Sequence, residues 1–514
     1  MLNLATSTGR PSRTTPPVPV CEQARISRDA RFDGLFFTAV TTTGIYCRPV
    51  CPAPPPKPRN VVYFPNAAAA EAAGFRPCLR CRPELAPSGG QWRRGDDAIA
   101  RAIKLIDEGV LDTAPVAALA KRLHLGERQL RRLFVDRLGV APLRVHNTRR
   151  LLFAKQLLTE TEMSITDVAM AACFGSLRRF NTAFKDAYRM APHELRQRPV
   201  AVPGGALVLR LGYRPPYDLA AMLDFLRRRA LPGSEVVDEC SYQRLIAPAE
   251  PAMTPGWLRI SAWPGGEPAL RLELHGVAPQ QLQAVVNGIR RMFDLDADPQ
   301  AIASVLSADQ RLKPLLKRRP GLRLPSSLDG FEIAVRAVLG QQVSIAAACT
   351  ATARLARRFG TMLATPHASG LEYLFPTPAM LADADLSGAG LTRARASSVR
   401  TIAQALLDGR IDFRPEQTLA EFVERWVALP GIGPWTAHYV ALRALAHPDA
   451  FPAGDLVLQK TIPTDGRRMT AKALEAHAEA WRPWRAYSVI HLWRAAAEAV
   501  KPRPATIIAR RKTA

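Results

Sequence analysis

The chain has 514 residues, of which 47% are hydrophobic and 22% are charged, an ordinary globular composition that suffices for three or four domains. It contains no run of about 18 apolar residues, so no membrane span is expected. Its 70 Lys and Arg residues outnumber its 45 Asp and Glu residues and leave a net charge of +25. A surplus of that size favours a polyanionic partner, most simply nucleic acid. A solvated basic surface is the alternative.

Residues 1–20 contain no acidic side chain and are predicted to form a disordered tail. The most informative feature follows, in a domain predicted over residues 21–88. Four of the eight cysteines form a C-x3-C pair and, 26 residues later, a C-x2-C pair: Cys47, Cys51, Cys78 and Cys81. Two such pairs can each supply one edge of a tetrahedral Zn²⁺ site, which by spacing alone is more often structural than reactive. The other four cysteines are isolated, which argues against a disulfide framework and for a reducing cytoplasm.

The sequences around these cysteines carry a resemblance. Thr41–Cys51 reads TTTGIYCRPVC and Gly74–Cys81 reads GFRPCLRC. Both are similar to the N-terminal domain of the Ada methyl-response family. The resemblance implies one Zn²⁺ bound by the four cysteines, with Cys47 also taking a methyl group from a DNA methylphosphotriester. Pro54 stands where that family has an arginine, so Lys57 or Arg59 is expected to contact the phosphate instead.

Four thiolates on Zn²⁺ give a formal charge of −2 and stay ionised at neutral pH. Methylation of one sulfur would change that charge to −1, reduce repulsion from the DNA backbone and tighten promoter binding. Because the modified cysteine has no evident return path, the transfer is expected once per molecule. The family's second acceptor domain, with its Pro-Cys-His-Arg sequence, is absent, so direct O6-methylguanine repair is not predicted.

An internal repeat marks the next predicted domain, residues 96–198. Phe134–Pro142 (FVDRLGVAP) recurs as Phe184–Pro192 (FKDAYRMAP) at an offset of 50. Each copy predicts a helix, a short turn and a second helix, over 116–123 and 127–138 and again over 165–173 and 176–188. This is the helix-turn-helix pattern, whose second helix enters the major groove; a helical hairpin with a basic face is the alternative. The second helices carry the predicted DNA-binding residues Arg128, Arg131, Arg132, Arg178 and Arg179.

This segment resembles the AraC/XylS-type DNA-binding domain. The resemblance implies sequence-directed promoter binding and an activator that works with RNA polymerase. Proline- and glycine-rich stretches at 86–95 and 198–206 are predicted linkers on either side of it.

Beyond the second linker, short alternating runs at 206–211 and 270–274 predict strands of an α/β domain over residues 206–298. Long helical patterns follow over 299–500. Within them, Leu429–Tyr439 (LPGIGPWTAHY) predicts a helix-hairpin-helix in which Gly431 and Gly433 let the backbone approach a DNA phosphate. Asp455 follows 22 residues after Gly433.

Five further sequence segments extend this pattern. They are Tyr213–Asp218, Pro320–Pro325, Val335–Ser344, Trp481–Tyr487 and His491–Trp493. Together with the hairpin they resemble the AlkA-type DNA-3-methyladenine glycosylase II. The resemblance covers about 206–500.

The resemblance to this glycosylase family implies catalysis by Asp455 and an aromatic slot built from Trp435, Tyr439 and Trp493. Gln342 stands where the family has a leucine wedge, and Leu456 replaces an aromatic residue beside Asp455. Lyases of the superfamily have a lysine at the position of Trp435, so hydrolysis without lyase activity is expected. Core packing for the two tryptophans, and a surface N-cap for Asp455, are the alternatives.

The predicted fold class is therefore multidomain and mainly α, with a small zinc-bound α+β domain, an antiparallel-sheet α+β domain and a helix-hairpin-helix glycosylase fold at the C-terminal end. A basic tail is predicted over 501–514. The predicted protein is a cytoplasmic, nucleoid-associated monomer that binds double-stranded DNA and one Zn²⁺. It combines alkylated-base excision with methyl-triggered transcription. The alternative is a zinc-dependent regulator whose glycosylase part only scans DNA.

Overall fold

The computed structural model describes residues 15–88, 98–196, 205–250, 253–462 and 467–500. The predicted tail 501–514 lies outside these ranges, as do most of the predicted tail 1–20 and of the linkers 86–95 and 198–206. Helix α1 (Val18–Ser27) begins within the segment 1–20 that is predicted as a tail. Among the described helices, none combines the length and the apolar character needed to cross a bilayer.

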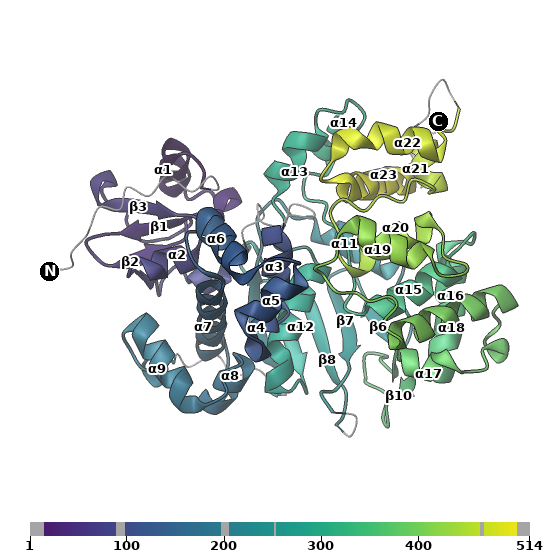
Figure 1. Ribbon diagram of the computed structural model, residues 1–514, viewed down its shortest axis with the longest axis horizontal. Helices are drawn as coiled ribbons and strands as arrows, with labels where there is room; N and C mark the ends of the chain where they lie inside the picture. Colours follow the sequence, from purple (N-terminus) through teal and green to yellow (C-terminus); the bar gives the residue numbers. More distant parts are fainter. Residues whose placement is uncertain (1–14, 89–97, 197–204, 251–252, 463–466, 501–514) are drawn as a thin grey trace, which may run out of the picture.

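The zinc domain is a four-stranded sheet with a helix on it (Figure 1). The strand order is β3-β1-β2-β4, and β2 and β4 run parallel while the other pairs are antiparallel. Tyr46 and Phe37 are buried in its small core, where their rings meet edge to face. The elements are β1 (Phe37–Val40), β2 (Ile45–Cys47), β3 (Val61–Phe64), β4 (Arg76–Pro77), α2 (Ala67–Ala72) and the 3-10 turns η1 (Ala30–Phe32), η2 (Pro58–Asn60) and η3 (Pro83–Leu85).

The next module is all helical and two-fold repetitive. The repeated sequence positions are its core: Leu130 and Phe134 in the first copy and Phe180 and Phe184 in the second are fully buried. The predicted helix-turn-helix pairs correspond to α5 with α6 and α8 with α9, and the long helix α7 joins the copies. The elements are α3 (Ala98–Asp107), α4 (Val110–Thr113), α5 (Val116–Arg122), α6 (Glu127–Leu138), α7 (Pro142–Glu160), α8 (Ile165–Ala171), α9 (Leu177–Tyr188) and α10 (Pro192–Leu195).

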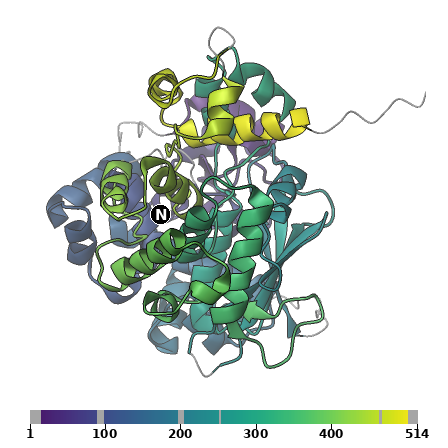
Figure 2. The same cartoon turned by 90° about the vertical axis from the view of Figure 1, so that its right-hand side faces the viewer.

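A five-stranded antiparallel sheet with order β5-β9-β8-β7-β6 forms the third module, seen edge-on in Figure 2. Alternate residues of its strands are buried, as in Leu258 and Ile260, because helix α12 covers one face. The elements are β5 (Leu207–Gly212), α11 (Leu219–Arg227), β6 (Glu235–Val237), β7 (Ser241–Ile246), β8 (Gly256–Ala262), β9 (Ala269–His275) and α12 (Pro279–Met292).

The fourth module is helical around α15 and α20, whose alanine- and valine-rich faces pack together. Its elements are α13 (Pro299–Leu306), α14 (Leu312–Arg318), α15 (Gly330–Leu339), α16 (Ile345–Phe359), β10 (Thr361–Met362), β11 (Tyr373–Leu374), α17 (Pro378–Ala382), η6 (Ser387–Ala389), α18 (Arg393–Leu407), α19 (Leu419–Val427), α20 (Pro434–Ala444), α21 (Leu456–Thr461), α22 (Ala471–Ala478), η7 (Glu479–Trp481) and α23 (Arg485–Val500). The predicted fold class is confirmed.

The modules are packed against each other by charged contacts. Lys155 of α7 is buried in an ion pair with Glu84, which joins the zinc domain to the helical module. Arg122 of α5 pairs at 2.7 Å with Glu416, just before α19. These contacts cross the predicted domain boundaries. The boundaries themselves stay predictions.

Candidate functional site: metal centre, DNA-binding helices and pocket

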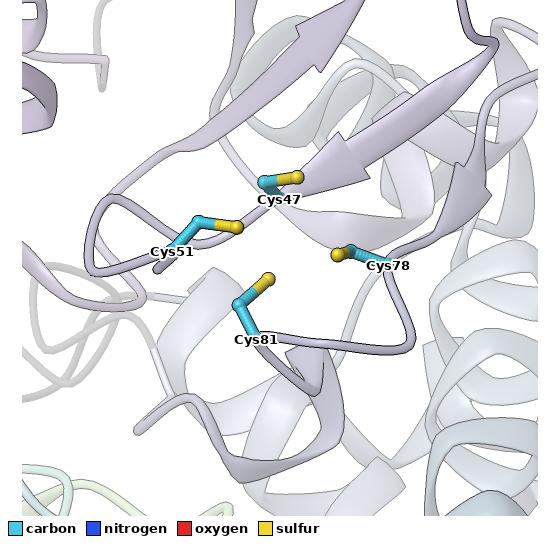
Figure 3. A group of neighbouring side chains, drawn as sticks. All are labelled: Cys47, Cys51, Cys78 and Cys81. Carbon is cyan, nitrogen blue, oxygen red and sulfur yellow. The ribbon is translucent and has the colours of Figure 1, made fainter. Parts of the chain in front are cut away.

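The sheet of the zinc domain brings the two cysteine pairs together. Cys47 is the last residue of β2, and Cys78 directly follows β4. Since the two strands are parallel neighbours, both cysteines leave the same edge of the sheet, and the Cys78 N–H donates to the Tyr46 carbonyl at 2.9 Å. Cys51 and Cys81 lie in the turns that follow. Figure 3 shows the four sulfurs converging from these two segments.

The geometry fits a tetrahedral metal ion. All four Sγ atoms lie within 4.8 Å of one another, and none forms a disulfide. Zinc–sulfur bonds of about 2.3 Å place tetrahedral sulfurs about 3.8 Å apart, which small side-chain adjustments reach here. Hydrogen bonds within the cluster lower the pKa of Cys51, chiefly through Cys47, to about 7, and also lower the pKa of Cys78. The same hydrogen bonds raise the pKa of Cys47, chiefly through Cys51, and of Cys81, chiefly through Cys47, so the four thiols share their protons when no metal is bound. Ionised thiols are the form that zinc binds.

The four sulfurs differ in exposure and in backbone contacts. Cys78 and Cys81 are buried, whereas Cys47 and Cys51 are half-buried. The Cys81 sulfur accepts the Arg48 N–H at 3.3 Å, and the Cys51 sulfur accepts the Ala53 N–H. Backbone donors stabilise the thiolate and reduce its nucleophilicity. The contacts of the Cys47 sulfur are with the other three cysteines.

Loss of one buried ligand should remove the metal. We expect Cys78→Ser to lower the bound zinc from one per chain to a small fraction and to lower the unfolding temperature of the zinc domain, because metal binding and folding of such domains are coupled. The matched control is Cys240→Ser, an exposed cysteine far from the cluster in sequence. Metal content by atomic absorption and thermal unfolding of both variants measure this; full zinc content in Cys78→Ser would contradict the four-ligand site.

The second helix of each helix-turn-helix copy presents its arginines to solvent. Helix α6 follows the turn at His124–Gly126, and α9 is capped by Ser176, whose side chain accepts the Arg179 N–H. The phenylalanines of these helices are buried. The predicted DNA-binding residues are all exposed: Arg128, Arg131, Arg132, Arg178 and Arg179. Both helices can thus offer basic side chains to DNA.

The predicted hairpin lies between α19 and α20. Gly431 has φ of +82°, in the left-handed region, whereas Gly433 is the extended N-cap of α20. A Cβ at Gly431 would lie 2.2 Å from the Ser398 hydroxyl, and a Cβ at Gly433 would meet nothing within 4 Å. Only the first glycine is therefore required by the fold.

This contrast gives a paired prediction. Gly431→Ala should lower the free energy of unfolding by about 1–2 kcal/mol, the cost of a left-handed L-residue. Gly433→Ala should change it by less than about 0.5 kcal/mol, yet weaken duplex binding because its methyl group stands where the backbone would approach a phosphate. Denaturant unfolding and DNA titration separate the two effects. Equal stability losses in both variants would contradict the assignment.

Asp455 lies at the N-cap of α21 and faces two tryptophans. Its carboxylate accepts the N–H groups of Val457 and Leu458 at 2.9 and 3.0 Å. It also accepts the indole N–H groups of Trp435 and Trp493, each at 3.3 Å. The capping role considered from the sequence is thus real, and the same carboxylate also faces the pocket.

The three predicted aromatic residues come together. Trp435 and Tyr439, one turn apart on α20, stack with centroids 5.3 Å apart, and Trp493 of α23 lies 6.2 Å from Tyr439. With Asp455 they line a cavity of about 520 Å³. Trp493 and Tyr439 also pack against the hydrophobic core, so these side chains both line the cavity and contribute to packing.

The structure adds residues that the sequence pattern missed. The ring of Phe225, on α11, stacks on the ring of Trp493 with centroids 6.5 Å apart. The Arg443 guanidinium donates to the Tyr439 hydroxyl at 3.2 Å. Burial raises the pKa of Tyr439, but the charges of Arg443, Arg229 and Arg336 outweigh it, so the pKa lies below its ordinary value. No linear spacing indicates Phe225, because it lies more than 200 residues before its partners.

Gln342 and Leu456 lie beside the cavity rather than in its lining. Gln342 is exposed, with φ of +56°, in the turn before α16, and Leu456 is 56% exposed. Their neighbours Val343 and Val457 line the cavity instead. The pocket role of Gln342 and Leu456 stays a prediction, since both are exposed and next to residues that line the cavity.

Comparison with protein families matches four consecutive parts of the chain. They are the metal binding domain of Ada at residues 20–84, a helix-turn-helix domain at 119–198, the AlkA N-terminal domain at 208–329 and the HhH-GPD superfamily of base excision DNA repair proteins at 335–486. The first match and the four-cysteine cluster together establish one zinc ion as the cofactor.

Individual relatives match over long stretches. A probable bifunctional transcriptional activator/DNA repair enzyme AlkA of Mycobacterium tuberculosis is 38% identical over 92% of this chain and 95% of its own length. DNA-3-methyladenine glycosylase 2 of Escherichia coli is 35% identical over 55% of this chain and 95% of its own. Among solved structures, the 3-methyladenine DNA-glycosylase from Archaeoglobus fulgidus is 23% identical, covers 57% of this chain and 99% of its own, and has a TM-score of 0.49.

Proposed function

The chain belongs to the family of bifunctional transcriptional activators and DNA repair enzymes that join an Ada-type metal-binding domain and a helix-turn-helix domain to an AlkA-type glycosylase, and we propose that it senses alkylated DNA, activates transcription in response and excises alkylated bases. The observation that carries the proposal is the Asp455 carboxylate, held by two indole N–H groups at the edge of an aromatic cavity.

The excision half acts on a base that has been flipped out of the duplex. A base alkylated at N3 or N7 is cationic, and the faces of Trp435, Tyr439 and Trp493 attract cations by about 0.5–2 kcal/mol. As the bond between C1′ and the base nitrogen breaks, its electron pair leaves with the base and positive charge develops on the sugar. Asp455 stabilises that charge and accepts the proton of the water that attacks C1′.

Release of the base without strand cleavage follows from Trp435. A lyase forms an imine between a lysine amine and C1′, and an indole nitrogen cannot do so. The product is therefore an abasic site. 3-Methyladenine and 7-methylguanine are the expected substrates, since both are good leaving groups that need only a permissive pocket.

The sensing half transfers one methyl group to Cys47. A zinc ion would be held by Cys47, Cys51, Cys78 and Cys81 and would keep these thiols ionised at neutral pH. The Cys47 sulfur attacks the methyl carbon of a methylphosphotriester, a carbon–sulfur bond forms, the carbon–oxygen bond breaks, and the electron pair leaves on the phosphodiester. Half-exposure of Cys47, and the backbone donors that lower the nucleophilicity of Cys51 and Cys81, favour Cys47 as the acceptor. The exposed Lys57 and Arg59 are the proposed phosphate contacts.

Transcriptional activation follows from the lost charge. Methylation of Cys47 removes one thiolate charge, so a four-cysteine zinc site would change from a formal charge of −2 to −1. Repulsion from the DNA backbone would then fall, and α6 and α9 would bind the promoter more tightly. We propose that the chain then contacts RNA polymerase and acts as a cytoplasmic, nucleoid-associated monomer.

The competing function is a zinc-dependent regulator whose glycosylase half binds DNA without catalysis. The two functions differ in one assay: methylated duplex is incubated with the full zinc-loaded chain and the free bases are quantified. Catalytic release of 3-methyladenine supports the enzyme; DNA binding with no release supports the regulator.

A further inference from the structure

Arg214 is a buried arginine at the junction of the sensing and excising halves. It follows β5, and its side chain is fully buried. Its guanidinium donates only to backbone carbonyls: Asp33 at 2.7 Å, Asp296 at 2.7 Å, Ala297 at 3.1 Å, Pro87 at 3.2 Å and Ser88. Three of these carbonyls belong to the zinc-domain side and two to the segment after α12. One side chain thus fixes three chain segments against each other.

The zinc-domain end of this junction reaches the metal centre through Arg48, the residue after Cys47. The Arg48 guanidinium donates to the buried Asp33 carboxylate at 2.9 and 3.1 Å and to the Cys81 carbonyl at 3.0 Å. Its backbone N–H donates to the Cys81 sulfur at 3.3 Å. The Asp33 carboxylate and the Cys81 carbonyl thus hold the guanidinium, while the backbone of the same residue contacts the Cys81 sulfur.

The other end reaches the base pocket through α11. Arg323 donates to the carbonyls of Arg214 and Pro216. Two residues later, Asp218 caps α11 by accepting the Ala221 N–H at 2.9 Å. Helix α11 carries Phe225, which stacks on Trp493, and Asp224, which pairs with Arg494 of the same helix α23 at 2.6 Å.

We propose that Arg214 is a positioning residue of the base pocket whose anchor lies in the zinc domain, so that the charge on the Cys47 sulfur alters the pocket. Methyl transfer removes one negative charge from the cluster that Arg48 contacts through Cys81. The contact between Arg48 and the cluster then weakens, and through Asp33 and Arg214 the packing of α11 loosens. Binding of the flipped base then weakens, typically by about fivefold or more for coupled sites. The chain therefore binds the flipped base more tightly before Cys47 is methylated than afterwards. This inference rests on the proposed function of both halves.

The test needs neither methyl transfer nor base release. Cys47→Met in the full, zinc-loaded chain replaces the thiolate by a thioether and removes the same charge. Hydrogen–deuterium exchange of α11 should rise several-fold in Cys47→Met relative to wild type. In an Arg214→Lys or Arg214→Gln background, Cys47→Met should cause no further rise. Arg271→Gln, a partly exposed β9 arginine paired with Glu273, is the matched background that should leave the full effect.

Unchanged exchange of α11 in Cys47→Met overturns the proposal, and so does an equal rise in the Arg214 backgrounds. A purely structural Arg214 would give additive effects rather than this loss of coupling. Excision kinetics give the second readout: Cys47→Met should raise KM about fivefold with kcat unchanged, because Asp455 is untouched. Failure to release any base would refute the proposed excision alone, since the exchange measurement would still decide the coupling.

Discussion

Asp455→Asn should lower the rate of 3-methyladenine release by roughly 10²–10⁴-fold, the usual contribution of a positioned acid–base group. Asparagine keeps the side-chain oxygen that caps α21, so the fold is retained. It lacks the negative charge that stabilises the sugar cation and the basicity that accepts a proton from water. Single-turnover release of 3-methyladenine from methylated duplex measures the effect, with DNA affinity measured in parallel.

The chain offers a closely matched control in Asp309. Its carboxylate also accepts two backbone N–H groups, from Arg311 at 2.7 Å and Leu312 at 3.2 Å, and an indole N–H, from Trp481 at 3.0 Å. It does not line the cavity that Asp455 lines. Asp309→Asn should therefore release base at the wild-type rate. An Asp455→Asn variant as active as this control would remove Asp455 from the mechanism.

The second large effect concerns Cys47. After exposure to duplex carrying a methylphosphotriester, the tryptic peptide with Cys47 should gain the mass of one CH2 group, at no more than one per chain. Cys47→Ser should gain none. Methylated protein should bind duplex roughly tenfold more tightly than unmethylated protein at low salt, because one repulsive charge near the phosphates is gone.

Cys51 is the discriminating site in that experiment, since it is half-buried like Cys47 and belongs to the same four-cysteine cluster. Peptide mapping distinguishes the two sulfurs. A methyl group on Cys51, or on none of the four cysteines, would contradict the assignment of Cys47 as the acceptor.

Much of the fold was predictable because local patterns recur in it. The repeated phenylalanines predicted both helix-turn-helix copies, and α6 has the predicted bounds of Glu127–Leu138. Cysteine spacing predicted the cluster, because two short-spaced pairs can close on one tetrahedral metal ion. The spacing did not predict that the pairing of β2 with β4 brings the two pairs together.

What the sequence could not give are contacts between distant segments. Phe225 enters the base pocket from another module, and Arg214 contacts carbonyls whose positions depend on the packing of three segments. No local sequence pattern indicates the contacts of either side chain. The interpretation of Gln342 and Leu456 as pocket residues rested on family position, whereas in the fold their neighbours Val343 and Val457 line the cavity.

One measurement tests the central claim that a single chain both senses and excises. The zinc-loaded protein is incubated with duplex carrying 3-methyladenine and methylphosphotriesters, and mass spectrometry quantifies free base and methylated Cys47 against time. Free 3-methyladenine should exceed the amount of protein many-fold, while methylated Cys47 should stop at one per chain. Free base no higher than in the sample without protein, under conditions in which the chain binds the duplex, would contradict the account.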